Sequence, residues 1–189
     1  QRKLKDSMLD RIEYNRLTDE SGGRASYELE FPDGGVAEVV GNIIQQGSGT
    51  LNSVIVSMGA ESYRWPVNRL VMAHNTVVND RRFGGTFVRV APGAQSVVLR
   101  NNLWVGPGRL DVPAQADDHG NHFVGWEAFV QAAREDYRLT DATRGRFNNA
   151  ALAAVPEAVL PAFEYRHPQA LIPMPSAAVV PGALQSGAR

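Results

Sequence analysis

One asparagine recurs in this sequence at a fixed place in a repeated pattern. Asn15, Asn42, Asn75 and Asn102 are separated by steps of 27, 33 and 27 residues. An apolar residue stands three positions before each asparagine and another two positions after it: Ile12, Val39, Met72 and Leu99 before, and Leu17, Ile44, Val77 and Trp104 after. Repeats of this length are typical of solenoids, in which each circuit of chain stacks on the one before. We therefore predict that the four asparagines share one column of a coiled parallel sheet.

A second strand is expected in each circuit, roughly midway between successive asparagines. Segments 27–31, 54–58 and 87–90 are rich in β-branched and aromatic residues, as strands are. A β-sandwich also has many short strands, but it would not return an asparagine to one place on every circuit. In a parallel coil, equivalent residues lie about 4.8 Å apart, so their amides can hydrogen-bond along the column. The alternative is that each asparagine only favours its own turn.

Several of these segments resemble a known group of proteins. The residues that carry the resemblance are 14–20, 27–35, 40–46, 74–80, 99–103 and the later 135–140. They look like the right-handed parallel β-helix repeat proteins of the pectin-lyase-like superfamily, over about residues 4 to 140 of the chain. The resemblance implies an all-β solenoid. No catalytic motif of any one family in the superfamily matches this sequence.

The resemblance also implies a class of function. It suggests a carbohydrate-active protein, a lyase or hydrolase acting on an acidic, uronate-containing polysaccharide, and an extracytoplasmic location. Calcium is suggested as a cofactor by the resemblance alone. Because the same fold also serves adhesins and tailspikes, a non-catalytic glycan-binding, adhesion or structural solenoid stays open as the alternative.

The chain divides into a repeat region and a distinct C-terminal part. Residues 1–140 are expected to form the rungs, with a short amphipathic helix near 126–135 that lies over the last rung, because Trp126, Phe129, Val130 and Ala133 have helical spacing. Residues 141–189 are Ala- and Pro-rich and are expected to be an extended tail packed on the solenoid, with a loose end. The first rung presents an open strand edge, through which the protein could associate with another chain.

Composition excludes some partners and sites. Lys and Arg total 19 against 20 Asp and Glu, a net charge of -1, so the basic footprint of a nucleic-acid-binding protein is missing. No apolar run is long enough for insertion into a membrane. The absence of cysteine excludes disulfides and thiolate metal sites.

Two places could bind an acidic sugar. If Tyr27, Leu29 and Phe31 face the core, Glu28 and Glu30 share the outer face, and Arg89 projects from an equivalent strand two rungs on. Ordinary surface ion pairs are the alternative. The longer repeat holds an inserted loop, 59–66, in which Tyr63, Arg64 and Trp65 offer stacking surfaces and a guanidinium. That loop could equally fold back over apolar wall such as Val40 and Ala73.

The histidines are expected to be structural or exposed. His74 precedes a ladder asparagine and is predicted to point inward as a structural residue. Asp117, Asp118, His119 and His122 include possible metal ligands, but their spacing matches no dedicated motif and they are expected to lie in a loop. We predict no metal site there.

Overall fold

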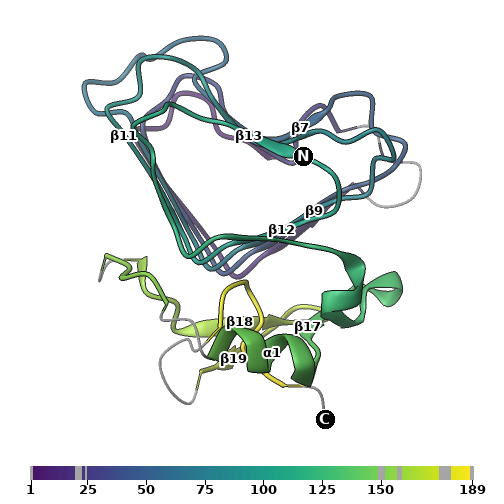
Figure 1. Ribbon diagram of the computed structural model, residues 1–189. Helices are drawn as coiled ribbons and strands as arrows, with labels where there is room; N and C mark the ends of the chain where they lie inside the picture. Colours follow the sequence, from purple (N-terminus) through teal and green to yellow (C-terminus); the bar gives the residue numbers. More distant parts are fainter. Residues whose placement is uncertain are drawn as a thin grey trace.

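The chain forms a parallel β-helix with a C-terminal segment packed against its side (Figure 1). This computed structural model describes residues 2–19, 23, 25–148, 152–156, 159–174 and 180–187. Three five-stranded sheets, all parallel, make the walls of the coil. Sheet A contains β1 (Arg2–Lys3), β4 (Leu29–Phe31), β7 (Val54–Met58), β10 (Thr86–Val90) and β13 (Arg109–Asp111). Sheet B contains β2 (Leu9–Glu13), β5 (Val36–Val40), β8 (Arg69–Ala73), β11 (Ser96–Arg100) and β14 (Asp117–His119). Sheet C contains β3 (Arg16–Thr18), β6 (Ile43–Gln46), β9 (Thr76–Asn79), β12 (Leu103–Val105) and β15 (His122–Val124).

Each circuit runs through sheets B, C and A in turn. The recurring asparagine stands between its sheet B strand and its sheet C strand, so the segment around it forms two strands separated by a corner. The strands predicted at 27–31, 54–58 and 87–90 are confirmed as β4, β7 and β10. The predicted parallel β-helix is therefore confirmed, with three strands in each circuit.

The interior of the coil is filled by columns of apolar side chains. Of the eight residues predicted to face inward beside the asparagines, Ile12 and Leu17 on the first circuit are partly buried and pack against one buried cluster. The other six belong to that cluster: Val39, Met72, Leu99, Ile44, Val77 and Trp104. Successive members of a column align across hydrogen-bonded strands, for example Ile44 with Val77 and Val77 with Trp104. Because stacking buries both edges of each inner rung, the core is continuous along the axis.

The C-terminal segment covers the outer face of sheet C and does not cap the end of the coil (Figure 1). It contains β16 (Phe129–Gln131), β17 (Asp136–Leu139), α1 (Asp141–Asn148), β18 (Phe163–Arg166) and β19 (Ala170–Pro173). Outward side chains of sheet C, such as Ile43 and Leu103, pack with Phe129, Tyr137 and Phe147 in a second buried cluster. One face of the solenoid is thereby turned into an interior surface.

The helix predicted near 126–135 is wrong. Two single-turn 3-10 helices, η1 (Trp126–Ala128) and η2 (Ala132–Arg134), flank β16, which pairs antiparallel with β17. Phe129 is extended and lies opposite Leu139, and both are buried against sheet C. Pairing these two strands buries both side chains, whereas the helical stripe would also have required Trp126 and Val130, which are exposed.

The expectation of an extended, loose tail also fails in part. Residues 141–148 form α1, where the hydroxyl of Thr140 accepts a hydrogen bond from the backbone N–H of Thr143 as an N-terminal cap. Strands β18 and β19 form an antiparallel hairpin. Near the end of the chain, Val180 and Ala183 are buried, and the backbone N–H of Gly182 donates to the carbonyl of Asn101.

Candidate functional site

The asparagines form a hydrogen-bonded ladder at the corner between sheets B and C. The Nδ2 of Asn15 donates to Oδ1 of Asn42 at 3.1 Å, Asn42 to Asn75 at 3.0 Å, and Asn75 to Asn102 at 2.9 Å. The ladder has a fifth member that the sequence analysis missed, Asn121, which accepts from Asn102 at 2.8 Å. Asn121 follows Asn102 by 19 residues, a shorter step than the repeats before it, and this shortening hid it.

A left-handed residue precedes every ladder asparagine. These residues are Tyr14, Gly41, His74, Asn101 and Gly120, with φ between 53° and 69°. Their conformation turns the chain from sheet B into sheet C. His74 is buried, but the predicted inward placement is wrong, because it lies against the backbone of Val180 and Gly182 in the C-terminal segment. Burial lowers the pKa of His74 to about 4, so the ring is neutral.

The charged residues predicted on sheet A do not form an open wall. Glu28 is 0% exposed and Glu30 only 4%. Glu30 aligns with Ser57, which aligns with Arg89, so Glu30 and Arg89 do share the outer face. The ammonium of Lys3 lies 3.7 Å from Glu30, however, and Nε of Arg89 donates to Asp111 at 2.8 Å. Glu30 and Arg89 therefore each lie beside an oppositely charged side chain.

The predicted position of Glu28 on the outer face is wrong. Glu28 precedes Leu29, which aligns with Val56 and Val88; the residues before those two, Ile55 and Phe87, belong to the buried core. Neither carboxylate oxygen of Glu28 has a hydrogen-bond partner among the described residues. Burial raises its pKa to about 7, and the nearby charge of Asp19 adds to the shift.

The inserted loop folds back onto the solenoid. The hydroxyl of Tyr63 donates to the carbonyl of Ala91 at 2.7 Å, and its ring fills a corner where a Cβ at Gly59 would lie 2.4 Å from Cζ. The indole nitrogen of Trp65 is buried, and the exposed guanidinium of Arg64 forms an ion pair with Asp6. The loop covers this corner, and Val40 and Ala73 are instead covered by Val159. Tyr63 and Trp65 are thus largely committed to packing.

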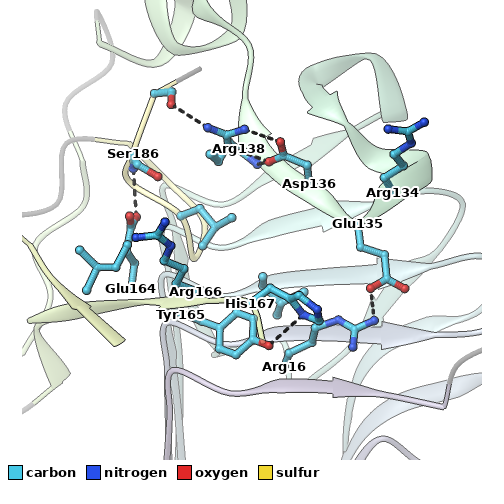
Figure 2. A pocket seen from close by; sticks show the side chains of 14 residues that line it. Arg16, Arg134, Glu135, Asp136, Arg138, Glu164, Tyr165, Arg166, His167 and Ser186 are labelled. Carbon is cyan, nitrogen blue, oxygen red and sulfur yellow. Dashed lines mark hydrogen bonds and ion pairs between the residues drawn. The ribbon is translucent and has the colours of Figure 1, made fainter. Parts of the chain in front are cut away.

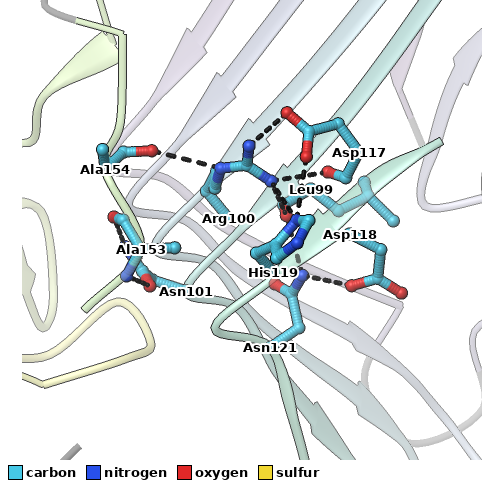
Figure 3. A network of polar contacts seen from close by, with 9 residues as sticks. All are labelled: Leu99, Arg100, Asn101, Asp117, Asp118, His119, Asn121, Ala153 and Ala154. Carbon is cyan, nitrogen blue, oxygen red and sulfur yellow. Dashed lines mark hydrogen bonds and ion pairs between the residues drawn. The ribbon is translucent and has the colours of Figure 1, made fainter. Parts of the chain in front are cut away.

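A polar network surrounds the last rung (Figure 3). Asp117, Asp118 and His119 lie in β14 and His122 in β15, not in a loop. Arg100 forms an ion pair with Asp117 and donates from Nε to the carbonyl of Ala154 at 3.1 Å, which ties the C-terminal segment to sheet B. No group of three or more histidine, aspartate or glutamate side chains suited to holding a metal ion occurs among the described residues.

A groove opens between the outer face of sheet C and the C-terminal segment (Figure 2). Its volume is about 700 Å³, and four arginines and three carboxylates line it. The lining residues are Arg16, Ile43, Arg134, Glu135, Asp136, Arg138, Glu164, Tyr165, Arg166, His167, Ile172, Leu184, Ser186 and Gly187. The first rungs of the solenoid supply Arg16 and Ile43, and η2, β17 and the β18–β19 hairpin supply most of the rest.

The three carboxylates of the groove are engaged by neighbours. Glu135 forms an ion pair with Arg16, and Asp136 accepts from Nε of Arg138 at 2.8 Å, which holds the pKa of Asp136 below its usual range. Glu164 accepts from the backbone N–H of Gln185 at 2.7 Å.

Arg134 and Arg166 line the groove and form no ion pair with any residue that the structure describes. Both are exposed, and neither bonds to a carboxylate of the residues that the structure describes. Beside them, the hydroxyl of Tyr165 donates to the carbonyl of Pro168 at 2.9 Å and lies 3.4 Å from Nδ1 of His167. The sequence analysis missed this site because it treated the segment as a plain tail; the run Tyr165-Arg-His167 was the available signal.

Comparisons with models of known protein families, with curated proteins and with solved structures find no match for this chain. None of the described helices is long and apolar enough to span a membrane.

Proposed function

We propose that this chain is a carbohydrate-active β-helix protein that binds an acidic, uronate-containing polysaccharide in the groove beside sheet C. The observation that carries the proposal is the pair of guanidinium groups, Arg134 and Arg166, that face a large cavity without a carboxylate partner among the described residues. A guanidinium presents its donors in a fork that matches a carboxylate. Tyr165 adds an aromatic face and a hydroxyl, groups suited to a sugar ring.

Of the two reaction classes implied by the resemblance to the pectin-lyase-like superfamily, elimination fits the groove better than hydrolysis. A hydrolase commonly uses two carboxylates, one as an acid and the other as base or nucleophile. In the groove, Glu135 and Asp136 are both held in ion pairs, and Glu164 accepts hydrogen bonds from two backbone N–H groups. A lyase needs cations that neutralise the uronate and a group that removes the adjacent proton. Arginines could serve the first need, and Tyr165 or His167 the second. A non-catalytic glycan-binding or adhesion module remains the second candidate, since Tyr165 already donates to a backbone carbonyl.

The test uses calorimetry to measure the binding of alginate, polygalacturonate and neutral dextran to the purified chain. We expect the two acidic polymers to bind and dextran not to bind. The double variant Arg134→Gln/Arg166→Gln should weaken the binding of the acidic polymers at least about tenfold. The matched control, Arg82→Gln/Arg109→Gln, removes the same charge from exposed residues outside the groove and should change Kd less than about twofold. Equal losses in both variants would mean only nonspecific attraction and would overturn the proposal.

Ultraviolet absorbance of the unsaturated product then separates the two candidates. A signal that the groove variant loses and the control keeps identifies a lyase, and binding without a signal identifies a non-catalytic module. Calcium dependence, an extracytoplasmic location and association through the open N-terminal edge of the solenoid remain predictions from the resemblance and the sequence.

A further inference from the structure

The groove does not end at Tyr165. A second cavity, of about 400 Å³, lies beyond it and is lined by Tyr14, Asn15, Arg16, Tyr165, His167, Pro168, Gln169, Ala170 and Leu171. Arg16, Tyr165 and His167 line both cavities. Both volumes fall in the range of about 300–1,000 Å³ that is usual for small-ligand sites. The two cavities are therefore neighbouring compartments, separated by these three side chains.

The compartments differ in chemistry. The first contains all four arginines of the groove, including Arg134 and Arg166. The second shares only Arg16 and His167 with it as basic groups, and contributes amides and aromatic or apolar side chains of its own. Arg16 is already paired with Glu135. A charged sugar is thus favoured on one side of Tyr165 and an uncharged sugar on the other.

Two side-chain amides in the second compartment keep hydrogen-bonding capacity that no residue in the described part of the chain uses. Asn15 is the first member of the ladder, so its Oδ1 accepts no hydrogen bond from any residue in the described ranges, although its Nδ2 donates to Asn42 and to the carbonyl of Glu13. The side-chain amide of Gln169, in the exposed turn of the hairpin, makes no hydrogen bond within the same ranges. Amides that donate and accept suit the hydroxyl and acetamido groups of neutral sugars.

We propose that the ligand is a polysaccharide in which uronate residues alternate with neutral sugars, with the uronate in the arginine-lined compartment and its neutral neighbour beside Asn15 and Gln169. This inference rests on the proposed function and narrows its substrate class from acidic polysaccharides in general to mixed ones.

The test compares a hyaluronan oligosaccharide, which alternates glucuronate with N-acetylglucosamine, with an oligogalacturonate of the same length. We expect the mixed oligomer to bind at least about tenfold more tightly. Gln169→Ala should weaken the binding of the mixed oligomer about fivefold and leave the binding of the oligogalacturonate unchanged. Gln131→Ala, an exposed glutamine outside both compartments, is the matched control and should change neither.

The outcomes separate the two proposals. If both oligomers bind equally and Gln169→Ala has no effect, the alternating ligand is wrong, while loss of binding in Arg134→Gln/Arg166→Gln would still support the anionic groove. If neither oligomer binds, both proposals are overturned.

Discussion

At the scale of single residues, Glu28 is the least expected feature of the core. A carboxylate stands where the following rungs have Ile55 and Phe87, and its oxygens have no partner among the described side chains. Removing a charged carboxylate from water is costly, and the protein avoids that cost by favouring the protonated form, with a pKa of about 7. The folded state therefore takes up a proton that an unfolded chain would release.

We predict that Glu28→Leu stabilises the protein most at alkaline pH. Because the folded pKa lies above the unfolded value of 4.5, the wild-type residue is least costly below about pH 4.5 and destabilises the fold progressively as pH rises through 7. The gain in unfolding free energy should be about 3 kcal/mol larger at about pH 8 than at about pH 4. Urea denaturation at both pH values measures it, with the exposed Glu127→Gln as control. A gain independent of pH would show that Glu28 does not titrate in this range.

At the scale of elements, the ladder ties successive rungs at one corner. Asn75 shows the complete pattern: Nδ2 donates to the carbonyl of Val39 at 2.8 Å and to Asn102, while Oδ1 accepts from the backbone N–H of Asn42 at 3.0 Å. Each interior amide thus satisfies backbone groups that the corner would otherwise leave buried and unpaired.

Truncating the ladder should cost more in its middle than at its end. We predict that Asn75→Ala lowers the unfolding free energy by about 3 kcal/mol, because buried donors and acceptors on both neighbouring rungs lose their partners. Asn15→Ala should cost about 1 kcal/mol, since Asn15 joins the column from one side only. Chemical denaturation of both variants measures the difference. Equal costs would mean that the asparagines act only on their local turns.

The strands were predictable from the sequence, and the C-terminal elements were not. The recurring asparagine and the apolar residue three positions before it predicted β5, β8 and β11, because each of these strands places an apolar side chain in the same inward column. The apolar spacing from Trp126 to Ala133 matched a helix, but whether Phe129 pairs with Leu139 depends on the sheet C face beneath them. Local periodicity carries no information about that surface.

At the scale of the whole molecule, the C-terminal segment joins the first rung to the last. Glu135 pairs with Arg16, and the backbone N–H of Ala162 donates to the hydroxyl of Tyr14 at 2.8 Å, both on the first circuit. On the last circuit, the ring of His122 lies 4.7 Å from that of Phe147. A solenoid is held mainly by contacts between neighbouring rungs, whereas this segment links distant ones.

Loosening this link should free the first rung selectively. In the variant Glu135→Gln/Tyr14→Phe, we expect hydrogen-exchange protection of the amides in β2 and β3 to fall about tenfold, with little change in β8 and β9. Mass spectrometry of exchanging peptides measures it, and Glu127→Gln serves again as control. A uniform loss of protection along the coil would contradict a role confined to the link.

The site was harder to predict than the fold because it is assembled from distant parts of the chain. Arg16 lies in the first circuit, Arg134 in a segment that looked helical, and Arg166 in one that looked featureless. Conversely, Glu28 looked exposed because strict alternation was assumed, while the residues before Val56 and Val88 both face the core. The local sequence pattern does not predict burial by a distant segment or an irregularity in a strand.

The hydrogen bonds between the ladder amides all point in one direction along the coil. Each amide–amide hydrogen bond of the column runs in the same sense, from the Nδ2 of one circuit to the Oδ1 of the next, so the donor end, which is the positive pole of this chain of bonds, lies at Asn121. There Asp118, aligned with the core residue Leu99, accepts from Asn121 at 2.5 Å, much as an acidic residue settles at the amino end of a helix. An inward carboxylate on a terminal strand also repels further strand pairing. If two molecules associate end to end along the axis of the coil, we expect them to do so through the first circuit, at the Asn15 end of the ladder.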